Sequence, residues 1–195
     1  MTDDERAHWN ERHRERLVPG EPEPFLLEML PLLPRGLTLD GLTLDMAAGR
    51  GRNSLLLART GRRVVAVDYS EAGLRILTQS ARPQGLPIWP VVADAASFPL
   101  GEKRYDAIVN INFLERKLFG AFKAALKEGG VLLVDTFMVG QAAFGHPRDP
   151  RHLLGRYELM ELLSGFEVLR YREGVVTYPD GTKASRASAV ARRNR

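Results

Sequence analysis

The chain contains no cysteine among its 195 residues. This absence excludes disulfides, thiolate metal sites and cysteine nucleophiles, and it makes a reducing cytoplasm the expected compartment. No apolar run approaches the roughly 20 residues that a membrane-spanning helix needs. The start, Thr2-Asp3-Asp4-Glu5, lacks the basic and then apolar pattern of a secretory signal. We therefore predict a cytoplasmic protein with no membrane partner.

Aromatic residues and lysine are also scarce. Aromatic residues make up 8% of the chain, and only five of the 28 basic residues are lysine. The net charge of +4 is a mild basic bias, and apart from the tail at 192–195 the arginines are dispersed. Recognition of RNA would require a basic stripe with exposed aromatic side chains. The composition therefore argues against a nucleic-acid partner.

The length and the apolar content of 44% suit one domain with its own core. We predict a single domain over 1–195, made of three parts. These are an N-terminal helical cap (1–36), a cofactor-binding core (37–137), and a substrate loop with a C-terminal hairpin (138–195).

Strand and helix patterns alternate from residue 41 to residue 136. The expected strands are 42–46, 63–67, 87–92, 105–111 and 131–136, and the expected helices are 4–16, 25–33, 53–59, 71–82, 116–127 and 157–163. This alternation predicts a Rossmann-like α/β fold with an open, mostly parallel sheet and helices on both faces. Strands 166–171 and 184–192 follow without a helix between them and are joined through Gly174 to Gly181. They predict an antiparallel hairpin at the sheet edge.

Residues 41–56 are the most informative stretch. An apolar strand ends at Asp45, a loop with Gly49 and Gly51 follows, and a helix then begins. Small residues there allow a ligand to lie against backbone N–H groups at the positive end of a helix. The next strand ends at Asp68, where a carboxylate can accept hydrogen bonds from the hydroxyls of a ribose. Together these features predict a nucleoside-containing cofactor at the carboxyl edge of the sheet.

A nicotinamide dinucleotide fits this loop less well. Its fingerprint, G-x-G-x-x-G, has a third glycine where this chain has Ser54. An aspartate, Asp45, closes the first strand, where it could face an amine-bearing ligand. The chain also lacks room for the second domain that most dehydrogenases use to hold substrate.

Five segments resemble, in order and spacing, the motifs of class I S-adenosylmethionine-dependent methyltransferases. They are Leu44-Asp-Met-Ala-Ala-Gly-Arg-Gly, Val65-Ala-Val-Asp-Tyr-Ser, Ala93-Asp94-Ala95, Tyr105-Asp-Ala-Ile-Val-Asn and Leu126-Lys-Glu-Gly-Gly-Val-Leu-Leu-Val. The flanks are similar to the narrower tellurite-resistance-protein-like group, at Trp9-Asn10-Glu11-Arg12, Gly51-Arg52-Asn53, Asn112-Phe113-Leu114-Glu115-Arg116 and Gly145-His146-Pro147-Arg148. The chain departs from the family at Ala47, where the family favours glycine.

The resemblance implies that the cofactor is S-adenosylmethionine. It assigns cofactor binding to Trp9, Arg12, Asp45, Ala47, Ala48, Gly49, Gly51, Asn53, Asp68, Tyr69, Asp94, Ala95, Asn110 and Asn112. The carboxylate of Asp45 would meet the methionine amino group directly or through water, and that of Asp68 would bind the ribose. Strand-end caps, a tight turn and core packing are the alternative roles for these residues.

The acceptor is expected above the ends of the fourth and fifth strands, beneath the loop at 138–152. Its His146 could take a proton and its Arg148 could hold an anion, although an ordinary surface loop explains both residues equally well. No metal is expected. The predicted function is methyl transfer by in-line displacement to a small nucleophile, with a metalloid oxyanion or a thiol among the acceptors that the resemblance allows. The alternatives are methylation of RNA or another macromolecule, and S-adenosylmethionine binding without catalysis.

Overall fold

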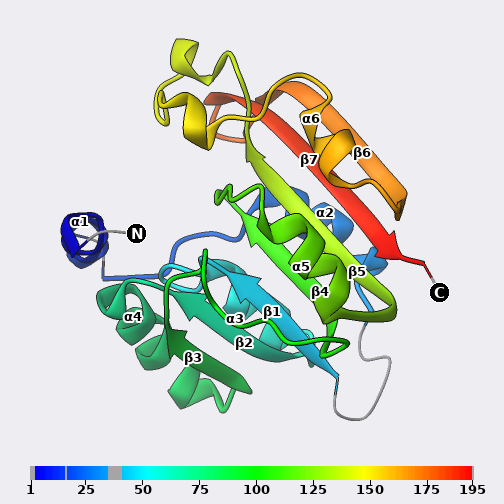
Figure 1. Cartoon of the computed structure of the whole chain (residues 1–195). Coiled ribbons are helices and arrows are strands. Elements are labelled where there is room, and N and C mark those ends of the chain that lie inside the picture. Colours follow the sequence, from blue (N-terminus) through cyan, green and yellow to red (C-terminus); the bar gives the residue numbers. More distant parts are fainter. Residues whose placement is uncertain (1–2, 16, 35–40, 195) are drawn as a thin grey trace.

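The computed structural model describes residues 3–15, 17–34 and 41–194 (Figure 1). Within these residues the chain forms one seven-stranded sheet with the order β3-β2-β1-β4-β5-β7-β6. The strands are β1 Leu42–Met46, β2 Arg63–Asp68, β3 Ile88–Val92, β4 Tyr105–Ile111, β5 Leu126–Phe137, β6 Phe166–Thr177 and β7 Lys183–Arg193. The α-helices are α1 Asp3–Arg14, α2 Pro24–Met29, α3 Arg52–Arg59, α4 Glu71–Ala81, α5 Leu118–Ala125 and α6 Glu158–Leu162.

The first five strands pair in parallel, and β7 pairs antiparallel with both β5 and β6. The predicted Rossmann-like sheet with a C-terminal antiparallel hairpin is therefore confirmed. The strand order reverses between β1 and β4, because β2 and β3 lie on one side of β1 while β4 and β5 lie on the other. In sheets of this kind, ligands bind at the carboxyl ends of the strands beside such a reversal.

Helices cover both faces of the sheet, and each face has its own apolar core. On one face of the sheet, Phe25 and Leu26 of α2 pack with Leu57 of α3. Apolar side chains of β4, β5 and β7 complete this core. Phe119 and Phe122 of α5 pack with α6 on the other face. Figure 1 shows α5 in front of the sheet and α2 behind it. No helix in the described part of the chain is long and apolar enough to cross a membrane.

Most elements match their predicted bounds to within one or two residues, but two helices end early for identifiable reasons. The helix expected over 25–33 ends as an α-helix at Met29 and continues as one 3₁₀ turn, Leu30–Leu32, because Pro31 has no N–H for the next α-helical bond. The helix expected to reach residue 127 ends at Ala125, and residues 126–130 belong to β5. Gly130 is needed within β5 because a Cβ atom there would lie 2.8 Å from the Lys127 carbonyl oxygen.

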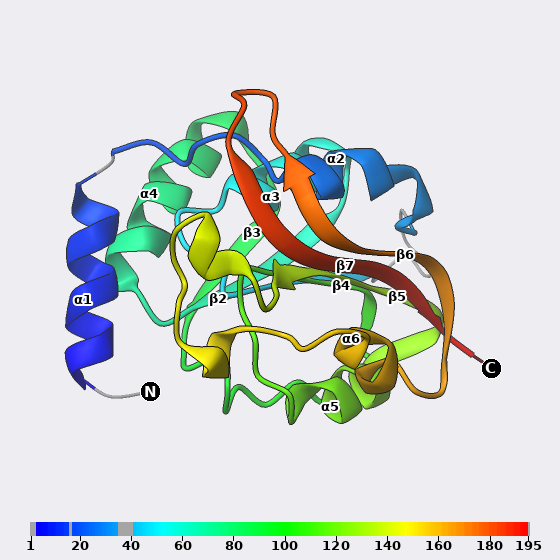
Figure 2. The ribbon, with the colours of Figure 1, turned by 90° about the horizontal axis from the view of Figure 1, so that it is seen from above.

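The hairpin is also longer than predicted. Strand β6 continues through Gly174 to Thr177, and the turn is confined to the residues from Tyr178 to Thr182, which are joined by a backbone bond of 2.8 Å. The longer strand extends the hairpin towards the carboxyl edge of β5. Figure 2 shows the turn beside the start of α2.

Candidate cofactor and acceptor site

The loop between β1 and α3 has a backbone that only small residues tolerate. Ala47 has a φ of 53° and Gly51 has a φ of 80°, both in the left-handed region. A Cβ atom on Gly51 would lie 2.2 Å from Cδ1 of Leu77, so a larger residue would collide with α4. The positive φ of Ala47 gives the physical reason why glycine is favoured at this position. This loop is referred to below as the glycine loop (residues 47–51).

Asp68, at the end of β2, ties the glycine loop to the start of α4. Its Oδ2 accepts a hydrogen bond of 2.7 Å from the Gly49 N–H, and its Oδ1 accepts one of 2.7 Å from the Ser70 N–H. Burial raises the pKa of Asp68, and these backbone hydrogen bonds oppose that rise. Each carboxylate oxygen has a further lone pair, so the group can still accept bonds from a ribose. Asp68 therefore suits its predicted role while also holding the loop.

Asp45 is almost fully buried, with an exposed fraction of 1%. Its Oδ2 accepts a hydrogen bond of 2.5 Å from Oγ of Ser54 on α3. Burial, reinforced by the charge of Asp68, raises the pKa of Asp45 to about 7. Asp45 was predicted to contact the methionine amino group of the cofactor either directly or through water. Its burial favours contact through water.

The three asparagines predicted to contact the cofactor are all engaged by other residues. Oδ1 of Asn53 accepts a bond of 3.0 Å from the N–H of Glu23. Oδ1 of Asn112 accepts one of 2.6 Å from the Arg186 guanidinium. Asn110 is buried and donates to a backbone carbonyl, while its Oδ1 has no hydrogen-bond partner among the described residues. Glu23 and Arg186 come from segments outside the recognised motifs, so sequence reasoning did not identify them.

Helix α1 lies against the start of α4 and the glycine loop through two residues that were not predicted. Oδ1 of Asn10 accepts bonds from the Ser70 hydroxyl at 2.8 Å and the Ala72 N–H at 3.1 Å, at the start of α4. The His13 ring lies against Gly49, where a Cβ atom would be 3.3 Å from its Cε1 atom. Burial, followed by the charges of neighbouring arginines, lowers the pKa of His13 to about 4, so this ring is neutral at pH 7.

The predicted residues of α1 are more exposed than these two. Trp9 has an exposed fraction of 38% and stacks on His13, with ring centroids 5.9 Å apart. The Arg12 guanidinium lies 5.1 Å from the Trp9 ring centre. The signal for the unpredicted Asn10 was present in the segment Trp9-Asn10-Glu11-Arg12, but only its first and last residues were chosen.

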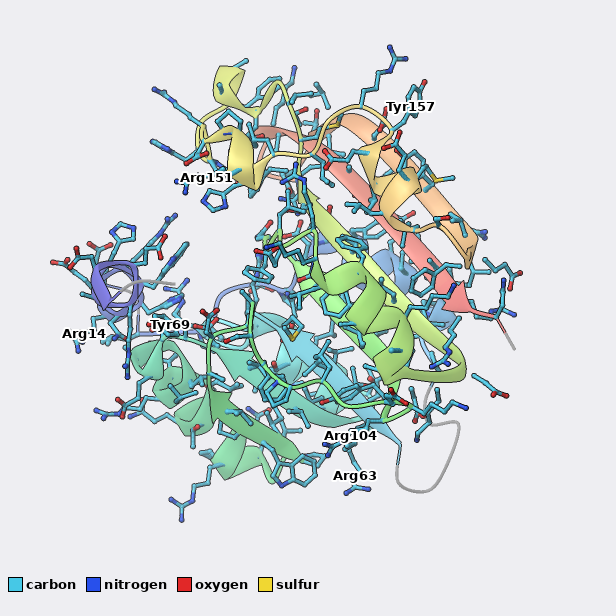
Figure 3. The ribbon with its side chains drawn as sticks, viewed as in Figure 1. Arg14, Arg63, Tyr69, Arg104, Arg151 and Tyr157 are labelled. Carbon is cyan, nitrogen blue, oxygen red and sulfur yellow. The ribbon has the colours of Figure 1, made fainter. Side chains whose placement is uncertain are left out.

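The residues expected at the adenine lie at the ends of β2 and β3. Tyr69 lies on the side of α1 (Figure 3), with the Arg6 guanidinium 5.5 Å from its ring centre. Oδ1 of Asp94 accepts a bond of 2.9 Å from the Ala96 N–H, as a turn cap does, and Ala95 is buried.

The loop at 138–152 exposes both of its predicted catalytic side chains, His146 and Arg148. Gln141 donates to the His146 carbonyl at 3.1 Å and so fixes the backbone there. Arg116 bonds Oε1 of Glu158 at 2.5 Å and the Leu153 carbonyl at 2.9 Å. Arg116 therefore anchors the carboxyl end of the loop. Figure 3 shows Arg151 of this loop on the side that faces α1.

A buried ion pair occupies the carboxyl end of β5. Nη2 of Arg186 lies 2.8 Å from Oδ2 of Asp135, and both side chains have exposed fractions of 2%. The Ser188 hydroxyl donates to Oδ1 of Asp135 at 2.7 Å. The same guanidinium lies 4.3 Å from the ring centre of Phe137 and reaches Asn112 at the end of β4. Two adjacent strand ends are thus joined through one arginine.

A cavity of about 170 Å³ lies between the start of α2 and the β6–β7 turn, and we refer to it as the hairpin pocket. It is lined by Glu23, Pro24, Glu28, Asp135, Arg172, Val176, Thr177, Tyr178, Pro179 and Arg186. Glu23, Asp135 and Arg186 are the buried members of this set. The Tyr178 hydroxyl donates to Glu23, and burial, with the nearby carboxylates, raises the pKa of Tyr178 to about 12. No group of histidine, aspartate and glutamate residues in the described ranges could hold a metal ion.

Residues 43–130 match a family model described as a methyltransferase domain. The strand order, the glycine loop and the antiparallel hairpin are those of the class I S-adenosylmethionine-dependent methyltransferase fold. The resemblance found in the sequence is therefore confirmed for the fold.

One curated relative is the demethylmenaquinone methyltransferase of Thermobifida fusca. It is 31% identical over 105 residues, which cover 49% of this chain and 43% of the relative. A second, an uncharacterised protein of Schizosaccharomyces pombe, is 25% identical over 187 residues, which cover 74% of this chain and 55% of that protein. The chain thus spans about half the length of the curated relatives that it matches.

Solved structures share the fold at lower identity. TehB from Haemophilus influenzae is 24% identical with a TM-score of 0.72, covering 89% of this chain and 63% of that one. A SAM-dependent methyltransferase from Methanosarcina mazei is 22% identical with a TM-score of 0.68, covering 90% and 99%. The 1,6-didemethyltoxoflavin-N1-methyltransferase of Burkholderia thailandensis, solved with 1,6-didemethyltoxoflavin and S-adenosylhomocysteine bound, is 22% identical with a TM-score of 0.60, covering 79% and 71%.

Proposed function

We propose that this protein transfers a methyl group from S-adenosylmethionine to a small-molecule nucleophile. The observation that carries the proposal is the bond of 2.7 Å between the Gly49 N–H and the Asp68 carboxylate. It brings the glycine loop and the ribose-binding acid together at the carboxyl edge, beside the reversal of strand order. That arrangement supports binding of a nucleoside cofactor.

The residues present fit this cofactor. Asp68 keeps free lone pairs for ribose hydroxyls, and the small residues of the glycine loop leave backbone accessible at the start of α3. Tyr69 offers a ring beside the adenine position. We assign Trp9, half-exposed on α1, to covering the bound cofactor.

When bound, S-adenosylmethionine supplies a methyl group on a sulfonium that is already activated for displacement. The protein is then required mainly to position two molecules and to exclude water. Asp68 and the glycine loop hold the cofactor, and the ends of β4 and β5 form the floor on which the acceptor lies.

A small acceptor is favoured by the size of the cavity at this edge and by the relatives. The hairpin pocket, at about 170 Å³, is below the 300–1,000 Å³ of usual drug-sized sites. A solved structure of the same fold holds a small heterocyclic acceptor, 1,6-didemethyltoxoflavin. These observations support a small molecule over RNA.

Calorimetric titration with S-adenosylmethionine and S-adenosylhomocysteine tests the cofactor role. Wild-type protein should bind with micromolar affinity, about −8 kcal/mol. Asp68→Ala should lose roughly 1.5–3 kcal/mol, because it removes charge-assisted acceptors. Asp149→Ala, which alters an exposed carboxylate in the 138–152 loop, is the matched control and should bind as wild type does.

Equal affinity in wild type and Asp68→Ala would refute the role of Asp68. Because this carboxylate also holds Gly49 and Ser70, circular dichroism and an Asp68→Asn variant separate loss of ligand contact from loss of fold. Tight binding with no S-adenosylhomocysteine released from any acceptor would favour a non-catalytic cofactor-binding protein instead.

A further inference from the structure

The hairpin pocket touches the cofactor edge through two of its buried residues. The backbone N–H of Glu23 bonds to Asn53, which lies in the first turn of α3, directly after the glycine loop. The guanidinium of Arg186 bonds to Asn112, which directly follows β4. Two of the residues that line the pocket are therefore joined by single hydrogen bonds to α3, close after the glycine loop, and to the residue that follows β4.

Both arginines of the pocket already have a carboxylate of their own. Arg186 pairs with Asp135 at 2.8 Å, and Arg172 pairs with Glu28 at 3.3 Å. The Arg186 guanidinium also donates to the Asp135 carbonyl and to Asn112, so its donors are largely used. The lining thus holds three carboxylates against two guanidinium groups, so an incoming anion would meet a net negative charge.

The acidic residues of the pocket can still accept hydrogen bonds from a ligand. Oε2 of Glu23 bonds Arg52, whose guanidinium lies 2.8 Å away and does not line the pocket. The Tyr178 hydroxyl donates to the same carboxylate. A carboxylate offers about four lone-pair positions, so Glu23 can still accept an N–H bond, as can the exposed Glu28 on the rim.

The size of the pocket limits what can bind. A volume of about 170 Å³ corresponds to five or six water molecules, at about 30 Å³ each. The mouth is formed by α2 and the hairpin turn, with Pro24, Thr177 and Pro179 on the rim. Only a compact molecule such as a single ring can be enclosed.

We propose that the hairpin pocket binds the methyl acceptor, and that this acceptor is a small nitrogen compound bearing N–H donors, not an oxyanion. In the transfer its neutral nitrogen lone pair would form the new N–C bond as the S–C bond of the sulfonium breaks, with S-adenosylhomocysteine as the leaving group and the nitrogen's proton released to water. This inference rests on the proposed function, because it takes the adjoining edge of β1 and β4 as the cofactor site. It moves the acceptor away from His146 and Arg148 and assigns its recognition to Glu23 and the hairpin.

Chemical-shift titrations of isotope-labelled protein saturated with S-adenosylhomocysteine test the inference. Imidazole and benzylamine are the nitrogen probes, and sodium selenite and sodium tellurite are the oxyanion probes. The amide signals of Glu23, Thr177 and Tyr178 should shift with at least one nitrogen probe and with neither oxyanion.

Thr177→Trp fills the mouth of the pocket and should weaken this binding at least about tenfold. Val175→Trp is the matched control, because Val175 is an exposed residue of β6 that does not line the pocket. It should leave the titration unchanged.

Three results would overturn the inference: shifts caused by an oxyanion, no shift with any probe, or equal binding by Thr177→Trp and wild type. A failure of the proposed function is separate, because it would appear first as absence of S-adenosylhomocysteine binding by calorimetry. The inference alone fails where S-adenosylhomocysteine binds and the pocket signals do not respond as stated.

Discussion

The two halves of the carboxyl edge are built in different ways. On the β1–β2 side the bonds join residues close in the sequence and mainly use the backbone, as from Gly49 to Asp68, 19 residues apart. On the β5–β7 side the bonds join distant charged side chains, with Arg186 reaching Asp135 over 51 residues and Asn112 over 74. A short motif can encode the first kind of site, whereas the second exists only after the sheet has formed.

The difference also predicts which substitutions lower the free energy of unfolding most. Backbone donors persist when a side chain is exchanged, but a buried ion pair depends on both partners. Removing one of them leaves a charge without compensation in the interior. Experiments on the two sides therefore test whether this contrast holds.

The largest effect is expected on the β5–β7 side. Arg186→Met should lower the free energy of unfolding by about 3–5 kcal/mol, because Asp135 is left buried and unpaired. Urea unfolding measures this. Arg192→Met, which removes an exposed partner of Glu167 at 3.6 Å on the same strand, should cost less than about 1 kcal/mol. Equal losses in the two variants would contradict the assigned importance of burial.

A pH-dependent effect is expected on the β1–β2 side. The pKa of Asp45 is about 7 in the folded protein against 3.8 for the free side chain, so the folded state holds the proton more tightly between these values. Its stabilisation is full below about pH 4 and is lost as pH rises through 7. The Asp45→Asn variant has no group that ionises at this position, so it does not lose this stability as the pH rises.

The unfolding free energy of Asp45→Asn relative to wild type should therefore rise by on the order of 3 kcal/mol from pH 4 to pH 7. Asp149→Asn is the control, because its pKa is lowered to about 2 by the Arg151 hydrogen bond, which confines its effect to more acidic solutions. A difference that stays flat across this window would show that Asp45 is ionised throughout.

A smaller effect is expected at α1. Asn10→Ala should reduce the stability of α1 docking by about 1 kcal/mol, because the Ser70 hydroxyl and Ala72 N–H lose their acceptor. Hydrogen exchange of the α1 amides should accelerate accordingly. Glu11→Ala, an exposed neighbour, should not change it. Exchange that is unchanged in Asn10→Ala would mean that His13 alone holds the helix.

The smallest effect is expected at the 138–152 loop. If the acceptor lies in the hairpin pocket, His146→Ala should leave turnover within about twofold, since its side chain is exposed. Steady-state release of S-adenosylhomocysteine with the best acceptor measures this. A loss of tenfold or more with unchanged cofactor affinity would return the catalytic role to the loop.

The sequence predicted the fold and the cofactor half of the site because both depend on local patterns. The strand ends at Asp45 and Asp68, the small loop residues and the hairpin follow from periodicity and turn chemistry. The predicted parallel pairing of the strands placed these residues at one edge. Their roles as ligands of a cofactor stay predictions.

The hairpin pocket could not be predicted because its residues carry no local pattern. Glu23 sits among prolines in an exposed-looking segment, and Arg186 is one of many dispersed arginines. Only the pairing of β7 with β5 shows that this arginine faces the buried Asp135. Likewise, the sequence alone does not show that Gly130 lies close to the Lys127 carbonyl, because only the fold positions that carbonyl.

Strand β7 separates β6 from the rest of the sheet, so among the described strands β6 pairs only with the strand that follows it. The hairpin consequently joins the sheet as one ribbon, attached to β5 through β7 alone. Its turn can change in length or chemistry without disturbing the pairing of β7 with β5 or the parallel strands beyond it. Under the proposed function, a change of acceptor in such a chain requires substitutions at only a few turn residues and leaves the cofactor-binding half unchanged.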